Sequence, residues 1–240
     1  MKAKIIGVIP ARYASTRFPG KPLADINGKP MIQRVYEQTL KAESLCGVIV
    51  ATDDERICRC VEDFGGRAVM TASELPNGTA RCEAAVRDIE GIDAVINIQG
   101  DEPLLDPLMI DEVSELLRND ECVTLCRKMS GNFDNPNAVK VVMTLDGYAL
   151  YFSRSLIPYK RSKSDLPIYE HIGIYGYSYG FLKKYVSLPS TPLSDAESLE
   201  QLKILEHGYR MRVKVTDSRH ESIGVDTPED LERVKEILNA

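Results

Sequence analysis

The sequence predicts an α/β fold in which a mostly parallel central sheet is flanked by helices. Three observations predict it: short apolar runs rich in β-branched residues, amphipathic stretches of helical period, and the alternation of the two along the chain. A strand, a crossover helix and another strand in succession are typical of a parallel sheet covered on both faces. Such sheets bind ligands beyond the carboxyl ends of their strands, so residues that follow a strand are candidates for the site.

The predicted elements alternate through the first half of the chain. Buried strands are predicted over residues 4–9, 47–52 and 94–98. Helices are predicted over residues 30–43, 54–64 and about 107–118. Pro30 suits the first position of the first helix. The apolar residues that recur at helical spacing in that helix are Met31, Ile32, Val35 and Tyr36.

The second half contains three further elements. Residues 171–179 alternate as a strand does, and His171 and Tyr175, four residues apart, are expected on one face. Residues 197–209 are predicted to form one amphipathic helix with a solvated charged face. A C-terminal helix is predicted to begin near Pro228, because Thr227 and Asp230 match a capping box.

Composition restricts the class of protein. Of the 240 residues, 43% are hydrophobic and 28% are charged, as in ordinary globular proteins. The formal net charge of -6 argues against a broad nucleic-acid-binding surface. The sequence shows no signal peptide and no apolar run of about 18 residues, so we expect a cytoplasmic protein that does not bind membranes. The cysteines lack paired C-x2-C zinc spacing, which favours free thiols.

The loop after the first predicted strand carries three cations among small residues and prolines. Its sequence is IPARYASTRFPGKPL (residues 9–23), with Arg12, Arg17 and Lys21. Small residues let backbone N–H groups approach a phosphate, while Arg pairs with two oxygens and Lys acts as a point charge. The alternative is a solvated surface loop. Neither a Walker pattern nor G-x-G-x-x-G is present, so we predict a small anionic ligand and find no support for a dinucleotide.

Two carboxylates are candidates for a divalent cation. Asp101 follows the predicted strand 94–98, and Asp226 precedes the C-terminal helix. Mg²⁺ takes one or two protein carboxylates and completes its shell with water and phosphate oxygens. Taken alone, Asp101 can be a turn residue and Asp226 an acid at a helix start. Because both would face a phosphate-binding loop, the sequence predicts a Mg²⁺ site.

Nine segments resemble one known family, in the same order along the chain. They are IPARYASTRFPGKPL, INGKPMI, VATDDE, NIQGDEP, NPNAVKVV, YALYFSR, HIGIYGY, LEQLKILEHGY and GVDTPEDLERV. Together they resemble the 3-deoxy-manno-octulosonate cytidylyltransferases, also called CMP-Kdo synthetases. The CMP-sialic acid synthetases share the first loop but lack YALYFSR and HIGIYGY. The resemblance implies a Rossmann-like nucleotide-diphospho-sugar transferase fold with a smaller mixed lobe for sugar binding and dimerisation.

The resemblance implies a nucleotide site with catalytic and metal-binding residues. The phosphates of CTP would be held by Arg12, Arg17 and Lys21. Mg²⁺ would bind Asp101 and Asp226, and the catalytic set would be Arg12, Lys21, Asp101 and Asp226. The cytidine moiety would lie near Gln99 and the segment 77–81. In that segment Gly78, Thr79 and Arg81 match the family pattern Ser-Gly-Thr-Asp/Glu-Arg, whereas Asn77 and Ala80 depart from it.

The same resemblance implies a sugar-acid site. Its residues would be Arg154, His171, Tyr175, Glu200 and Gln201. Arg154 would pair either with an acid of the site or with the carboxylate of the sugar. By pattern alone, His171 is more typical of a structural histidine. The stretch between Arg154 and His171 is shorter than in many family members, so the rim of the sugar pocket is expected to differ.

The function implied is transfer of CMP from CTP to 3-deoxy-manno-octulosonate (Kdo), with release of pyrophosphate, for lipopolysaccharide biosynthesis. A related acidic sugar, either 8-amino-Kdo or sialic acid, is one alternative substrate. A CTP or sugar-nucleotide binding protein without turnover is another alternative. We expect a single nucleotidyltransferase domain, with residues 1–129 and 226–240 binding the nucleotide and residues 130–225 forming the sugar and dimer lobe. The resemblance also implies a homodimer.

Overall fold

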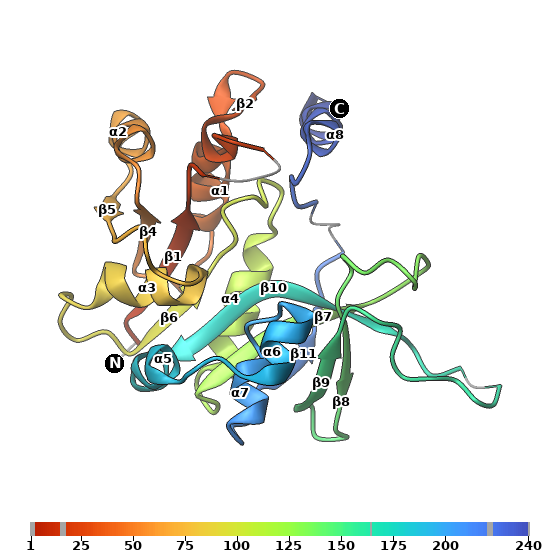
Figure 1. Ribbon diagram of the computed structural model, residues 1–240. Coiled ribbons are helices and arrows are strands. Elements are labelled where there is room, and N and C mark those ends of the chain that lie inside the picture. Colours follow the sequence, from red (N-terminus) through yellow and green to blue (C-terminus); the bar gives the residue numbers. More distant parts are fainter. Residues whose placement is uncertain (1–2, 15–17, 164, 220–222, 240) are drawn as a thin grey trace.

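A twisted central sheet runs through the molecule, and helices lie on both of its faces (Figure 1). The computed structural model describes residues 3–14, 18–163, 165–219 and 223–239. Within these residues the sheet has the strand order β11-β7-β10-β6-β1-β4-β5, and the β8–β9 hairpin joins it through β10. Its strands are β1 (Ile5–Ala11), β4 (Gly47–Thr52), β5 (Ala68–Met70), β6 (Ala94–Asn97), β7 (Cys122–Lys128), β8 (Lys140–Met143), β9 (Ala149–Ser153), β10 (Tyr169–Ser178) and β11 (Arg212–Val215).

The helices divide between the two faces according to where their apolar residues lie. On one face α3 (Gly78–Val86), α5 (Tyr179–Ser187) and α7 (Leu202–Glu206) contribute to one buried cluster, and α6 (Pro192–Glu197) adjoins α7. On the other face α1 (Met31–Thr39), α2 (Glu55–Asp63) and α4 (Pro107–Leu116) contribute to a second cluster. The C-terminal helix α8 (Pro228–Asn239) packs through a third, smaller cluster instead.

Strand β10 determines which residues reach the ligand-binding edge. It pairs antiparallel with both β6 and β7, whereas β1, β4, β5 and β6 are mutually parallel and β11 is parallel to β7. The beginning of β10 therefore lies at the edge where β6 and β7 end. This reversal brings His171 to the same edge as the residues that follow β6.

The predicted alternation is confirmed, with small differences in the element boundaries. The strand predicted over 47–52 is β4, and the helices predicted over 54–64 and 107–118 are α2 and α4. The first helix begins at Met31, because Pro30 is extended (ψ 146°) and belongs to the β2 (Asp25–Ile26) and β3 (Lys29–Pro30) hairpin. Asn27 and Gly28 join that hairpin with positive φ values of 49° and 81°, as a tight type I′ turn requires.

The single helix predicted over 197–209 is wrong. Ser198 has φ 50°, a left-handed conformation that ends α6, and helical structure resumes only with α7. Leu199 and Leu202 are nevertheless buried, as apolar residues on one face of a helix would be. Their spacing therefore resembled that of a single amphipathic helix. The break turns Glu200 and Gln201 toward the interior of the molecule, where a continuous helix would have presented charges to solvent.

The two predicted parts of the chain share one sheet. Residues 130–225 supply β10, which lies between β6 and β7, and also β11 at the edge. The division into a nucleotide part and a sugar and dimer lobe stays a prediction. Within the described residues, no helix has the length and apolar character needed to cross a membrane.

Candidate active site

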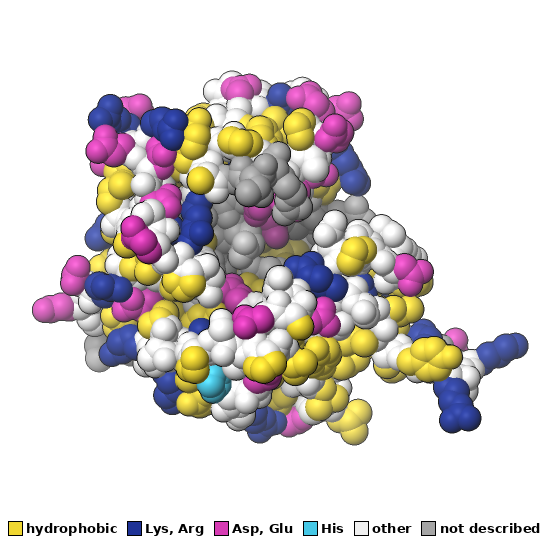
Figure 2. Space-filling view, in the orientation of Figure 1, with side chains coloured by type: hydrophobic (Ala, Val, Ile, Leu, Met, Phe, Trp, Pro, Cys, Tyr) yellow, Lys and Arg dark blue, Asp and Glu magenta, His cyan; other side chains and the backbone are white. Residues whose placement is uncertain are grey.

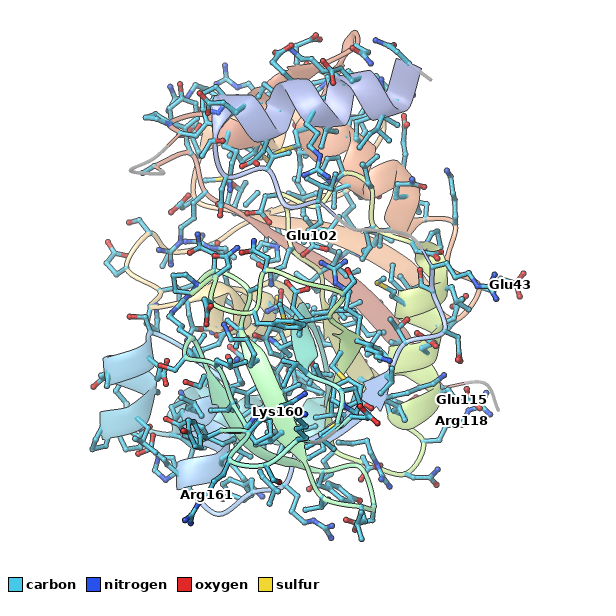
Figure 3. The ribbon with its side chains drawn as sticks, turned by 90° about the vertical axis from the view of Figure 1, so that its right-hand side faces the viewer. Glu43, Glu102, Glu115, Arg118, Lys160 and Arg161 are labelled. Atoms are coloured by element: carbon cyan, nitrogen blue, oxygen red, sulfur yellow. The ribbon has the colours of Figure 1, made fainter. Side chains whose placement is uncertain are left out.

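Two adjacent cavities open at the carboxyl edge of the sheet. A smaller cavity of about 450 Å³ lies between the first loop and α3, and a larger one of about 850 Å³ lies between β10, the 198–201 turn and the segment before α8. Gln99 and Asp101 line both, so the cavities meet there. Figure 2 shows the molecule hollowed in this region. In Figure 3, Glu102, which also lines the larger cavity, lies centrally between α8 and the β8–β9 hairpin.

The first loop is shaped by Gly20 and presents Lys21. Gly20 has φ 72°, and its N–H donates to the carbonyl of Tyr13 at 2.9 Å, which closes the loop. A short 3-10 helix (Lys21–Leu23) follows and positions the Lys21 ammonium. Arg12 lines the smaller cavity and donates to the carbonyl of Leu75. Arg17, the third predicted cation, lies outside the described residues.

Lys21 forms ion pairs with both of the carboxylates that were predicted to bind a metal ion. Its Nζ lies 2.6 Å from Oδ2 of Asp101 and 3.4 Å from Oδ1 of Asp226. Asp101 follows β6, and its carbonyl accepts the N–H of Val225 at 2.8 Å, which attaches the segment before α8. The Oδ2 atom of Asp230 accepts the backbone N–H groups of Asp226 and Thr227, so the predicted capping box is confirmed and fixes the start of α8.

The carboxylate pair fits Mg²⁺ in its chemistry. Both side chains are partly exposed (30% for Asp101 and 43% for Asp226), which leaves room for water and phosphate oxygens. In the described part of the chain, no group of three or more His, Cys, Asp or Glu residues could hold a metal ion. Asp101 and Asp226 therefore fit an ion whose remaining ligands come from water and from a nucleotide.

The segment 77–81 begins α3 and forms one wall of the smaller cavity. Asn77 caps the helix by accepting the N–H of Ala80 at 2.9 Å, so an Asn at this position retains the capping role that a Ser would have. A Cβ on Gly78 would approach Pro10 to 3.2 Å, and one on Gly100 would approach the carbonyl oxygen of Pro10 to 2.8 Å. Glycine at both positions therefore lets the start of α3 and the segment after β6 pack closely against Pro10.

Arg81 and Thr79 are buried behind that wall. Arg81 lines the cavity although its side chain is fully buried, and its guanidinium pairs with Asp53 at 3.0 Å and donates to Thr71. Burial lowers the pKa of Arg81, and the Asp53 carboxylate opposes that effect. Thr79 accepts from Asn97 at 3.1 Å and hydrogen-bonds to Glu200, and it is not among the residues that line either cavity.

His171 and Tyr175 lie side by side in the larger cavity, as predicted for one face of a strand. Their ring centroids are 5.3 Å apart, although β10 is irregular between Ile172 and Tyr175. The Thr124 hydroxyl lies 2.7 Å from the carbonyl of Ile174 and 2.9 Å from His171 Nε2, and an imidazole that carries its proton on Nε2 satisfies both contacts. Burial lowers the pKa of His171 to about 3. The neutral imidazole lines the larger cavity, and with the proton on Nε2 its Nδ1 is an acceptor.

The 198–201 turn supplies two further polar groups. The hydroxyl of Tyr175 donates to Gln201 Oε1 at 3.3 Å, and Gln201 Nε2 is buried without a hydrogen-bond partner among the described residues. Burial raises the pKa of Glu200, although hydrogen bonds from Thr79 and Tyr185 act in the opposite direction. The unpaired Nε2 donor suggests a missing acceptor, which a ligand in this cavity would provide.

Arg154 lies behind the larger cavity. Its guanidinium donates to the carbonyls of Glu197 (2.7 Å), Pro136 (3.0 Å) and Ser198 (3.3 Å). Arg154 is not among the residues that line the cavity. In this arrangement it positions the turn that carries Glu200 and Gln201.

Known proteins resemble the chain over most of its length. The model of the cytidylyltransferase family matches residues 6–219. The chain belongs to the cytidylyltransferase family. It is 49% identical to a 3-deoxy-manno-octulosonate cytidylyltransferase of Thermodesulfovibrio yellowstonii, over 98% of each chain. It is equally 49% identical to an 8-amino-3,8-dideoxy-manno-octulosonate cytidylyltransferase of Shewanella amazonensis, over 96% of this chain and 97% of that one.

One solved structure resembles this cytidylyltransferase in both sequence and fold, and another resembles it in fold alone. A CMP:2-keto-3-deoxy-manno-octonic acid synthetase complexed with CTP superposes with a TM-score of 0.92 at 42% identity, over 99% of both chains. A 4-diphosphocytidyl-2C-methyl-D-erythritol synthase from Anaerococcus prevotii superposes with a TM-score of 0.66 at 13% identity, which shows a shared fold alone. The predicted α/β fold and the predicted family are confirmed.

Several residues of the two cavities were not found from the sequence. Tyr185, on α5, accepts from Asn77 at 3.3 Å and donates to Glu200 at 3.2 Å, and so connects the walls of the two cavities. Arg127 and Glu170 line the larger cavity as an ion pair. No motif marks these contacts, because the partners come from distant parts of the chain. Of the predicted residues that the structure describes, all but Thr79 and Arg154 line one of the two cavities.

Proposed function

We propose that this chain couples CTP to Kdo and forms CMP-Kdo and pyrophosphate. The observation that carries the proposal is the meeting of the two cavities at Asp101, beside Lys21. The smaller cavity has the cations that a triphosphate needs, and the larger cavity has neutral and acidic hydrogen-bonding groups, with Arg127 beside Glu170, suited to a polyhydroxylated sugar. The names of relatives that are about half identical over nearly the full length support the same substrates.

The chemistry needs no covalent nucleophile from the protein. The anomeric hydroxyl of the sugar attacks the α-phosphorus of CTP, so a new O–P bond forms and the bond to pyrophosphate breaks, while the hydroxyl proton passes to water. Such transfers depend on in-line positioning and on stabilisation of charge. Lys21 and Arg12 stabilise the negative charge that develops on the departing pyrophosphate.

Mg²⁺ belongs to the same proposal, with Asp101 and Asp226 as its protein ligands. When bound there, it supplies positive charge against the phosphate oxygens and acts as a Lewis acid. Lys21 lies between the two carboxylates and reduces their mutual repulsion until the nucleotide arrives. Because the two carboxylates are only part of a coordination shell, we expect the ion to bind together with CTP.

The sugar is held by neutral hydrogen-bonding groups. His171 Nδ1 accepts from a hydroxyl, and Gln201 Nε2 donates to an oxygen. Tyr175 is protonated, since burial raises its pKa well above the ordinary value, and it keeps the Gln201 amide in place. Arg154 acts indirectly by fixing the carbonyls of the turn.

The decisive test is a turnover assay with each of the four ribonucleoside triphosphates and with Kdo, 8-amino-Kdo and sialic acid. Pyrophosphate release is followed, and the sugar nucleotide is identified by mass. We expect CTP and Kdo to be the preferred pair, with the product at the mass of CMP-Kdo. A preference for a purine nucleotide, or turnover with sialic acid alone, would contradict the proposal. CTP binding without turnover of any sugar would indicate the binding protein.

A homodimer is proposed as well. An arm that begins after β9 projects from the lobe and carries Leu156 and Tyr159, 42% and 88% exposed. Figure 1 shows the arm extending away from the lobe, and Figure 3 labels Lys160 and Arg161 on it. A second copy would bury these apolar side chains. We expect sedimentation at twice the monomer mass of 26.8 kDa, and a monomeric Tyr159→Glu variant. The cytoplasmic location stays a prediction.

A further inference from the structure

An ion pair lies in the wall of the larger cavity, outside the residues assigned above. Arg127 of β7 and Glu170 of β10 are directly paired residues of the sheet, and Arg127 Nε lies 2.9 Å from Glu170 Oε2. Both side chains line the cavity and keep 32% and 22% of their surface exposed. A ligand in the cavity can therefore reach both charged groups.

Among the described residues that line this cavity, Arg127 is the only Lys or Arg. The Asp and Glu residues that line the cavity are Asp101, Glu102, Glu170, Glu200, Asp226 and Asp230. Arg127 thus neutralises the one carboxylate that lies beside it. The Lys140 ammonium raises the positive potential near Glu170, although its own hydrogen bonds go to the carbonyls of Asn135, Ala138 and Arg154.

The pair lies on the side of the cavity away from the phosphate-binding loop. That loop follows β1, and in the strand order β1-β6-β10-β7 Glu170 of β10 is two strand spacings from β1, about 10 Å, and Arg127 of β7 is three, about 14 Å. In Kdo the anomeric hydroxyl and the carboxylate are attached to the same carbon. Both must then lie near Asp101 and Lys21, and the opposite end of the sugar, with its terminal C8 group, extends toward Arg127 and Glu170.

We propose that the Arg127–Glu170 pair makes the enzyme select a sugar with a terminal hydroxyl over one with a terminal ammonium. This inference rests on the proposed function and determines its substrate. A hydroxyl can accept from the guanidinium or donate to the carboxylate. An ammonium would be repelled by Arg127, and its best acceptor, Glu170, is already paired. The relatives do not decide this point, since the chain is 49% identical both to a Kdo enzyme and to an 8-amino enzyme.

The test compares kcat/KM for Kdo with kcat/KM for 8-amino-Kdo at pH 7, where the amine is protonated. We expect the wild-type enzyme to prefer Kdo by about 10-fold or more, the scale of one charge-assisted hydrogen bond. Arg127→Gln frees the Glu170 carboxylate and should lower that preference by about 10-fold. Glu170→Gln frees the guanidinium and should raise it. The double variant, with neither charge, should fall between the two single variants.

Arg210→Gln is the matched control, because it also removes an arginine from a 2.9 Å ion pair, with Asp146, outside the cavity. Its substrate ratio should equal that of the wild type. A merely structural role for the pair would lower both rates together, and an unchanged ratio in all three cavity variants would overturn the inference. A wild-type preference for 8-amino-Kdo would overturn it too. Failure of the proposed function is a different result, in which the wild type uses neither sugar.

Discussion

Burial of the His171 imidazole should make the stability of the protein depend on pH. The unfolded chain binds a proton near the ordinary pKa of 6.5, whereas the folded imidazole stays neutral until about pH 3. The contribution of His171 to stability is therefore complete above pH 6.5 and falls as the pH drops, by about 1–2 kcal/mol between pH 7 and pH 5, whereas the raised pKa of buried Glu200 acts in the opposite direction. Depressed carboxylate pKa values, such as that of Glu197, act mainly below this range.

His171→Gln, which cannot titrate, should remove that dependence. Its unfolding free energy, measured by urea denaturation at pH 7, 6 and 5, should change by about 1–2 kcal/mol less than that of the wild type. The absolute stability can fall in the variant, because a ring contact is lost, so the slope with pH is the readout. Equal slopes in the two proteins would show that folding does not shift the pKa of His171.

Asp101 and Asp226 provide a residue-scale test of the metal proposal. Asp101→Asn and Asp226→Asn keep the shape of each side chain and remove its charge. Each should lower turnover at limiting Mg²⁺ by about 10²-fold, as expected when a preorganised electrostatic group is lost. Asp88→Asn, at an exposed carboxylate after α3, is the control and should have the wild-type rate. Turnover that persists after chelation of divalent cations would exclude the metal proposal.

At the scale of one element, α8 connects a small apolar cluster to the proposed Mg²⁺-binding residues. Leu231 and Val234 pack with Ile26, Met31 and Val225, and Asp226 lies at the start of the helix. This cluster is separate from the two that hold the sheet, so loss of its contacts should loosen α8 before the sheet unfolds. The position of Asp226, and with it the binding of Mg²⁺ and CTP, should depend on this packing.

Leu231→Ala tests that dependence. The substitution removes a side chain that is 7% exposed and should destabilise the attachment of α8 by about 2–3 kcal/mol. The Mg²⁺ concentration for half-maximal turnover should rise several-fold, and hydrogen exchange should accelerate in α8 more than in β1 or β6. Ile237→Ala, at a residue of the same helix that is 46% exposed, should change neither quantity. Unchanged Mg²⁺ dependence in Leu231→Ala would contradict this role of α8.

At the scale of the whole molecule, the two cavities share one wall, and we expect them to bind their ligands independently. Tyr175 lines only the larger cavity and donates to Gln201. Tyr175→Phe keeps the stacked rings and removes one neutral hydrogen bond, so kcat/KM for Kdo should fall by about 3- to 10-fold. CTP binding, measured by calorimetry without sugar, should change by less than about 0.5 kcal/mol. Parallel losses of CTP binding and sugar use would mean that the cavities form one site.

The sequence determined the features that depend on local patterns. The alternation of β-branched runs and amphipathic stretches predicted β1, β4, β6, α1, α2 and α4, because the side-chain periods of strands and helices follow from backbone geometry. The loop 9–23 and the acids at strand and helix ends predicted an anion site with two carboxylates, and Lys21 does lie between Asp101 and Asp226. The position of Arg17 could not be compared, since it lies outside the described residues.

The way in which distant segments meet depends on long-range contacts that no local pattern contains. The antiparallel direction of β10 brings His171 to the edge where β6 ends, and strand direction is set by pairing between residues far apart in the sequence. The left-handed Ser198 ends α6 against the helical periodicity, so that Glu200 and Gln201 turn inward. Likewise Arg127 and Glu170 became neighbours only through the register of β7 with β10, which no local pattern contains.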